Sequence, residues 1–283
     1  MHFAIGDFVL DLIQNSVEAG SSLIEVDIDE AVMTNLDSMA QRFFAPGFHA
    51  GVAMQVRVVL TGEGGHFCSG GDLRQLARRR ELPVEERRAK LEGLHDLIRT
   101  VRDCRKPVIA AVEGAAAGAG LSLALACDML VAARNAVFSV AYVKVGLTPD
   151  GGATAFLAEF VSRQVLTELC LTGERISGER LHALGPVNRL AEPGEALTQA
   201  LALAAQVATG PDTAMANIKA LCRSAYAQPL ADQLELEAQL MVQSQATEES
   251  REGIAAFLEK RPADFARLRQ APATAATQPD TTK

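Results

Sequence analysis

The stretch VRVVLTGEGGHFCSGGDL, residues 56–73, determines the architecture that we expect for this chain. Its first part, Val56 to Gly62, is short, β-branched and stopped by glycine, as is typical of a buried strand. The residues after it, 73–101, are rich in Arg, Glu and Leu at helical spacing and predict a helix. Between them, Gly70 and Gly71 free the backbone to turn its N–H groups into a pocket, as anion sites at helix starts require. A tight turn without a ligand is the alternative interpretation.

A second strand, turn and helix follow. KPVIAAVEG (106–114) predicts a buried strand, and AGAGLSLALACD (117–128) has the small, apolar composition of a helix that is buried all round. MLVAAR and AVFSV then predict further short strands. This alternation predicts the α/β class, with a mostly parallel sheet covered by helices, and the helical period dominates from Thr154 onward.

The glycines at the start of this second helix predict a second anion-binding turn. Gly118, Ala119 and Gly120 let backbone N–H groups approach a ligand closely, and the helix dipole adds partial positive charge. Two such turns together suit the enolate oxygen of a thioester. Taken singly, each glycine is explained equally well by close packing of the helix on the sheet.

Composition excludes several classes of protein. The chain has 283 residues, 48% of them hydrophobic, so it can bury a large core. Lys and Arg number 27 against 35 Asp and Glu, and the net charge of −8 disfavours nucleic acid and anionic membrane surfaces as partners. Five cysteines without C-x-x-C spacing predict core thiols and neither disulfides nor a zinc site. No segment has the features of a secretory signal or a membrane span, so we expect a cytoplasmic protein.

The motifs, in this order and spacing, resemble the enoyl-CoA hydratase/isomerase (crotonase) superfamily. The resemblance rests on residues 56–73, on KPVIAAVEGAAAGAGLSLALACDMLVAARNAVFSV, on KVGLTPDGG and on LTGERISGERLHALGPVNRL, and it extends to REGIAAFLEKRPADF near the C-terminus. It implies a ββα-spiral core, a homotrimer or a dimer of trimers, and an acyl-CoA thioester as substrate, with coenzyme A entering only as part of that substrate and no separate cofactor. The expected division is residues 1–30 as an atypical N-terminal helix and strand, 31–195 as the spiral core, 196–268 as a C-terminal helical region, and 269–283 as a disordered tail.

The resemblance assigns site residues by position. The backbone N–H groups of Gly71 and Ala119 would hold the thioester oxygen, although family members usually carry glycine where Ala119 stands. The contacts with coenzyme A would fall at Cys68, Ser69, Asp72, Leu73 and Arg74 around the first turn, and at Phe257 and Lys260 near the C-terminus.

The two glutamates of the family's hydratases are absent from their matching positions. Ser122 and Tyr142 stand there, and neither replaces a carboxylate as a base near neutral pH. Asp150, in TPDGG, matches the position where isomerases of the superfamily carry an acid. We therefore expect Asp150 to be the acid/base of the site, in a pocket lined by Tyr142, Ser122 and Leu147. The alternative is that Asp150 caps the helix that begins near Thr154.

The N-terminus departs from the family pattern. Residues 7–19 predict an amphipathic helix and 23–29 a strand. The helix resembles one ATP-site motif of the GHKL ATPases, but their later motifs are missing, so we expect no ATPase activity.

The leading hypothesis is therefore an enoyl-CoA isomerase. Its alternatives are a hydratase-like lyase that recruits another group and a non-catalytic protein that binds CoA thioesters. The remaining histidines, including His66, His95 and His182, have no carboxylate or cysteine at ligand spacing, and we expect no metal.

Overall fold

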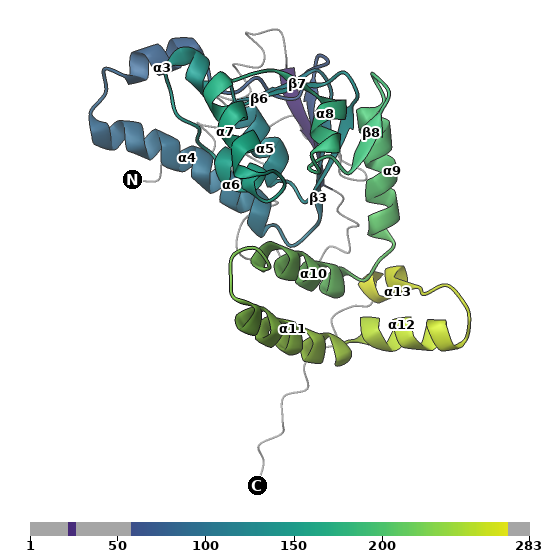
Figure 1. The fold of residues 1–283 in the computed structure, drawn as a ribbon. Coiled ribbons are helices and arrows are strands. Elements are labelled where there is room, and N and C mark those ends of the chain that lie inside the picture. The colour runs from purple at the N-terminus through teal and green to yellow at the C-terminus, as the bar shows by residue number, and fades with distance from the viewer. Residues whose placement is uncertain (1–21, 27–57, 271–283) are drawn as a thin grey trace. The chain divides into compact units, whose positions relative to one another are not determined.

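The computed structural model describes residues 22–26 and 58–270. The chain divides into two compact units, and the described part of the first comprises 22–26 and 58–208, whereas the second comprises 209–270 (Figure 1). The expected N-terminal helix at 7–19 lies outside the described residues. So does the expected tail at 269–283, except for its first two residues, which are the end of a helix and not a disordered tail.

A five-stranded sheet forms the centre of the first unit. Its strand order is β1 (Ser22–Val26), β2 (Val58–Glu63), β3 (Val108–Val112), β5 (Met129–Ala133) and β8 (Arg189–Ala191). The pairs β2–β3, β3–β5 and β5–β8 are parallel, and only β1 runs antiparallel to its neighbour β2. The expectation of a mostly parallel sheet is confirmed, and the N-terminal strand pairs at its edge.

The sheet is buried because helix α9 (Ala196–Ala208) packs on one of its faces. Ile109 and Val131 of the sheet form a cluster with Ala200 and Leu203 of α9. All five residues of β3 are buried, so both faces of this strand are covered. This double coverage is why the strands are continuous apolar runs rather than alternating ones.

The sequence predicted one helix over residues 73–101, and this prediction is wrong. The structure has two helices there, α3 (Leu73–Arg79) and α4 (Val84–Asp103). Pro83 stands at the N-cap of α4. Proline has no N–H and cannot continue a helix, but it is tolerated at a helix start.

Three short strands form a second sheet, in the order β4 (Ala115–Ala117), β6 (Val137–Ser139) and β7 (Ile176–Ser177). The alanine triplet of β4 has no strand signal in the sequence, and its pairing with β6 places it in the sheet. Helix α5 (Ala119–Ala126) follows β4 and is buried at all eight positions, as expected. The unit is completed by η1 (Ala141–Val145), α6 (Ala153–Ala158), α7 (Arg163–Thr172) and α8 (Gly178–Ala183).

The second unit is helical and contains α10 (Asp212–Ser224), α11 (Leu230–Gln245), α12 (Glu248–Leu258) and α13 (Phe265–Gln270). A carboxylate on α12 caps the start of α10, because Glu249 accepts hydrogen bonds from the N–H groups of Thr213 and Ala214.

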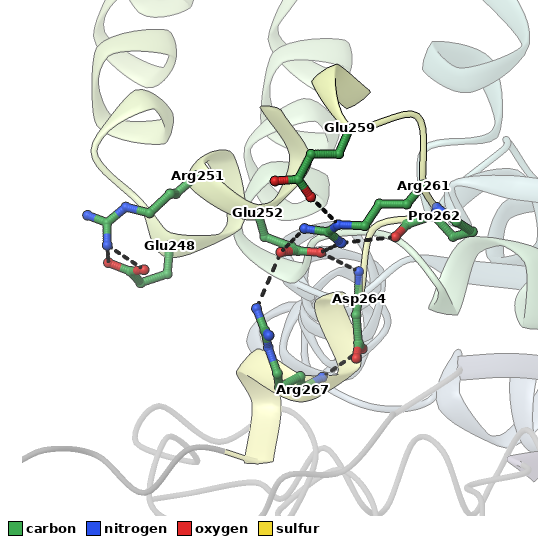
Figure 2. Close-up of polar contacts among 8 residues, drawn as sticks. All are labelled: Glu248, Arg251, Glu252, Glu259, Arg261, Pro262, Asp264 and Arg267. Carbon is green, nitrogen blue, oxygen red and sulfur yellow. Dashed lines mark hydrogen bonds and ion pairs between the residues drawn. The ribbon is translucent and has the colours of Figure 1, made fainter. Parts of the chain in front are cut away.

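Glu252 holds the end of this unit together (Figure 2). Its carboxylate accepts two hydrogen bonds from Arg261, at 2.6 and 3.1 Å, and one from the Asp264 N–H at 2.8 Å. Arg267 approaches the same carboxylate at 3.3 Å. Hydrogen bonding from Arg261 is the main reason why the pKa of Glu252 is lowered to about 2.

Replacing Glu252 with glutamine should destabilise the protein at neutral pH and make its stability less dependent on pH. A lowered carboxyl pKa contributes stability above the ordinary value of 4.5, and this contribution disappears as the pH falls toward about 2. Thermal unfolding followed by circular dichroism should show a gap between wild type and E252Q that narrows in this range. Glu248→Gln on the same helix is the matched control, because its ion pair with Arg251 is exposed and contributes little. Equal effects of the two substitutions would contradict the assignment.

All five cysteines are free thiols. Cys68 and Cys127 are buried as expected, but Cys222 is exposed on α10, so its expected place in the core is wrong. In the described part of the chain, no helix is long and apolar enough to cross a membrane.

Candidate active site

The two glycine turns lie side by side in the first unit. The Cys68 N–H donates to the Ala115 carbonyl, and the Ala117 N–H donates to the Cys68 carbonyl, each at 2.9 Å. The first turn therefore runs along β4 and reaches the start of α5, although the two segments are far apart in the sequence.

Glycine is required where the two turns touch. Gly70 has φ of 93°, and a Cβ there would lie 2.8 Å from the Ala117 carbonyl oxygen and 3.4 Å from the Ala119 nitrogen. A Cβ at Gly120 would overlap the carbonyl oxygen of Cys68. These two positions allow the backbones to approach, which side chains would prevent.

The N–H groups of Gly71 and Ala119 are available to a ligand. Within residues 22–26 and 58–270, neither donates a hydrogen bond to a protein acceptor. Ala119 is the first residue of α5 and is buried, so its N–H adds to the partial positive charge of the helix start. A buried N–H without a partner is uncommon in proteins and is suited to an oxygen anion.

Asp150 is held next to the second turn by Tyr142 and Ser122. The Tyr142 hydroxyl donates to Asp150 Oδ1 at 2.7 Å, and the Ser122 hydroxyl donates to the Asp150 carbonyl at 2.9 Å. Ser122 is on α5, and the ring of Tyr142 lies against Gly118 at the start of that helix. The carboxylate is thus connected to the helix whose first N–H is free.

The alternative, in which Asp150 caps the next helix, is wrong. The N-cap of α6 is Gly152, and no side chain provides a capping hydrogen bond there. Only the backbone carbonyl of Asp150 participates in the turn, accepting from the Ala153 N–H at 3.2 Å. The side chain is left to interact with Tyr142.

Burial determines the protonation behaviour of this pair. Burial raises the pKa of the Asp150 carboxyl above its ordinary value, although the hydrogen bond from Tyr142 and the charge of His95 oppose the shift. Burial, followed by the nearby Asp150 charge, also raises the pKa of the Tyr142 hydroxyl. Tyr142 therefore stays protonated and serves as a donor, and Asp150 is the member of the pair that can lose and regain a proton.

Replacing Tyr142 with phenylalanine should move the acidic limb of the kcat profile to higher pH. The lost hydrogen bond favours the charged carboxylate, so the pKa of Asp150 should rise further without it. We expect a several-fold loss of turnover in mildly acidic solution and a smaller loss in alkaline solution. Tyr226→Phe is the matched control, because the only other tyrosine is exposed in the helical unit. An unchanged acidic limb in Y142F would contradict this role.

The residues expected to bind coenzyme A are distributed over both units. Around the first turn, Cys68 is buried, whereas Ser69, Leu73 and Arg74 are exposed, and the Asp72 carboxylate caps α3 by accepting from the Arg74 N–H at 2.7 Å. Phe257 and Lys260 are exposed in the second unit, at the end of α12 and directly after it. Leu147, which was expected to line the pocket around Asp150, is exposed, and its N–H donates to the Tyr142 carbonyl.

Sequence reasoning did not predict that the charge of His95 on α4 lowers the pKa of Asp150, against the larger effect of burial. No local spacing could have revealed it, because the two residues belong to different elements. The other histidines have structural contacts: His66 accepts from the Ala115 N–H, and His182 hydrogen-bonds the Val187 carbonyl. No group of three potential metal ligands occurs among the residues that the structure describes.

The first unit thus contains two free N–H groups on adjoining turns and a half-buried carboxylate that is hydrogen-bonded to the helix starting at one of them. Such a site can stabilise an oxygen anion while moving a proton. The fold and the site therefore indicate an enzyme that acts through an anionic oxygen intermediate. Comparison with known proteins identifies the family: residues 53–268 match the model of the enoyl-CoA hydratase/isomerase family, and the chain belongs to this family. The crotonase fold expected from the sequence is confirmed.

Some relatives are named as hydratases and others as isomerases. A "Probable enoyl-CoA hydratase" of Rhodobacter capsulatus is 35% identical over 89% of this chain and 97% of its own length. The 1,2-epoxyphenylacetyl-CoA isomerase of Escherichia coli is 36% identical over 74% of this chain and 80% of its own. The crystal structure of an enoyl-CoA hydratase from Polaromonas sp. JS666 has a TM-score of 0.72 and 49% identity, covering 74% of this chain and 81% of that one.

Proposed function

We propose that the protein isomerises an enoyl-CoA by moving its double bond, with Asp150 as the acid/base. The observation that carries the proposal is the Tyr142–Asp150 hydrogen bond of 2.7 Å, which, with the hydrogen bond from Ser122, ties a half-buried carboxylate to the helix that begins with the free N–H of Ala119. Both positions that match the hydratase glutamates are occupied by side chains that hold Asp150 in place. One proton-transfer group is sufficient for isomerisation.

In the proposed reaction, Asp150 removes a proton from the carbon next to the thioester carbonyl of a 3-enoyl-CoA. The electrons move onto the thioester oxygen, giving a dienolate whose negative charge is stabilised by the N–H groups of Gly71 and Ala119. Asp150, now neutral, returns the proton two carbons further along, and the double bond moves into conjugation with the carbonyl. Atoms and charge balance without a cofactor.

The raised pKa of Asp150 supports this role. A carboxylate that is destabilised by burial is a stronger base than an exposed one, and its neutral form is stable enough to persist until the proton is returned. Ser122 and Tyr142 contribute by fixing the backbone and one oxygen of Asp150, which leaves the other oxygen for the substrate.

Hydration is the second candidate, and the names of several relatives favour it. Adding water to a 2-enoyl-CoA requires a group that positions the water as well as one that delivers the proton. Asp150 would need a partner for this purpose. A protein that only binds CoA thioesters is the third candidate. Homotrimeric assembly and a cytoplasmic location stay predictions from the resemblance and the composition.

The decisive experiment is turnover by the purified protein of a 3-enoyl-CoA and, separately, of a trans-2-enoyl-CoA. We expect conversion of the first substrate to the 2-enoyl isomer and little 3-hydroxyacyl-CoA from the second. Hydration as the faster reaction would overturn the isomerase assignment. Binding of both thioesters without turnover of either would support the binding protein.

A further inference from the structure

We propose that α3 and the start of α4 form a docking surface for an acidic carrier protein, which presents the acyl thioester to the site on a phosphopantetheine arm. This surface, residues 73–91, is named the basic hairpin. The inference rests on the proposed function, because the arm must deliver a thioester to the N–H groups of Gly71 and Ala119. Coenzyme A holds its thioester on the same arm, so the chemistry at the reacting carbons is unchanged.

The basic hairpin has a charge opposite to that of the chain as a whole. It contains seven Lys and Arg against three Glu, within a chain whose net charge is −8. Salt screens surface charges beyond about 10 Å, so a partner that contacts only this hairpin meets a positive surface. An extended anionic surface would also meet the acidic remainder of the chain and be repelled. The charge distribution therefore favours a compact acidic partner.

Several cations of the basic hairpin are available to such a partner. Within residues 22–26 and 58–270, the side chains of Arg78, Arg87 and Arg88 form no hydrogen bond or ion pair, and all three are exposed. Arg80 pairs with Glu81 at 3.6 Å, but these side chains are 78% and 80% exposed, and a pair of this kind contributes little. The positive charge is thus not neutralised by the acids of the hairpin.

Exposed aliphatic side chains favour a protein over a nucleotide as the occupant. Leu73, Val84 and Leu91 are 58%, 63% and 44% exposed on the same hairpin. Protein interfaces combine apolar contact area with arginine, which is enriched in them. The resemblance to the family assigns one cation here, Arg74, to coenzyme A. The other cations and the aliphatic side chains are left for a larger acidic surface.

The hairpin is joined to the site at both of its ends (Figure 1). On α3, the Leu76 Cδ1 would lie 3.7 Å from a Cβ at Gly71. On α4, the first buried residue is Leu94, just after the basic hairpin, and its Cδ2 would lie 3.3 Å from a Cβ at Gly151, next to Asp150. The exposed cations lie between these two contacts in the chain. A partner bound to them would hold its arm close to the oxyanion turn.

The test compares three thioesters of one 3-enoyl group, carried by an acidic bacterial acyl carrier protein, by coenzyme A and by pantetheine alone. Arg78→Glu/Arg88→Glu reverses two exposed charges of the hairpin. Arg175→Glu/Arg180→Glu is the matched control, because it changes the total charge equally at exposed positions of the first unit outside the hairpin.

We expect R78E/R88E to lower kcat/KM for the carrier-protein thioester at least about tenfold, as for loss of electrostatic steering. Turnover of the other two thioesters should not change. The control R175E/R180E should keep the wild-type values with all three. Added salt should reduce the difference between wild type and R78E/R88E, because the docking is electrostatic.

Equal losses with coenzyme A and with the carrier protein would overturn the docking surface, because the hairpin would then bind phosphate. Isomerisation of the coenzyme A thioester without turnover of the carrier-protein thioester would also overturn it and leave the isomerase proposal intact. If no thioester is isomerised, calorimetry with the carrier protein separates the two failures. Binding that is lost in R78E/R88E and kept in R175E/R180E would retain the surface and reject the isomerase, whereas absence of binding would overturn the surface. Circular dichroism verifies folding, and Arg78→Gln/Arg88→Gln replaces a variant that does not fold.

Discussion

Asparagine at position 150 should lower isomerase turnover by about 10²- to 10⁴-fold, the usual contribution of a general acid/base. Asparagine preserves the size of the side chain and can still accept the hydrogen bond from Tyr142, which holds Oδ1 at 2.7 Å in the wild type. It cannot take up and return a proton. The loss should therefore appear in kcat with a 3-enoyl-CoA, whereas the affinity for a CoA thioester should change little.

Asp150→Glu provides the matched variant for this prediction, because it keeps a carboxylate but displaces it by one methylene. We expect partial activity in D150E, above that of D150N. If both variants turned over every enoyl-CoA tested at the wild-type rate, the acid/base assignment would be wrong. The proton would then be transferred by a group outside the hydrogen-bonded network of Asp150, Tyr142 and Ser122.

Replacing Gly71 with proline should lower kcat by about 10²- to 10³-fold, since losing one oxyanion donor costs about 3 to 4 kcal/mol of barrier. Proline has no N–H, so the substitution removes the donor directly. The effect should be on kcat more than on binding, because the negative charge develops on the thioester oxygen only in the enolate.

Gly71→Ala separates loss of the donor from disturbance of the turn. A Cβ at this position would have the Leu76 side chain as its nearest neighbour, at 3.7 Å, an ordinary contact, and Gly71 does not have a positive φ. Alanine retains the N–H, so turnover should stay near the wild-type rate. Losses of equal size in G71A and G71P would show that the shape of the turn, and not the N–H, limits the reaction.

Much of the fold could be predicted from local patterns. The runs that became β2, β3 and β5 are short and apolar, the first two are stopped by glycine, and the three pair in parallel as expected. The interruption between α3 and α4 was missed although Pro83 marks it, because a dense helical composition on both sides outweighed one breaker. Strand β4 could not be predicted, since three alanines become a strand only through pairing with β6.

The sequence by itself determined the α/β class and the two glycine turns, because these depend on residue type and on neighbours along the chain, and its resemblance to the family singled out Asp150 as the candidate acid. Tertiary structure decided how they combine. It placed Cys68 against β4, turned the Tyr142 hydroxyl onto Asp150 and brought Leu94 of α4 to Gly151 in the same turn. The physical reason is that hydrogen bonds and pKa shifts depend on distances between segments remote in sequence, which no local pattern specifies.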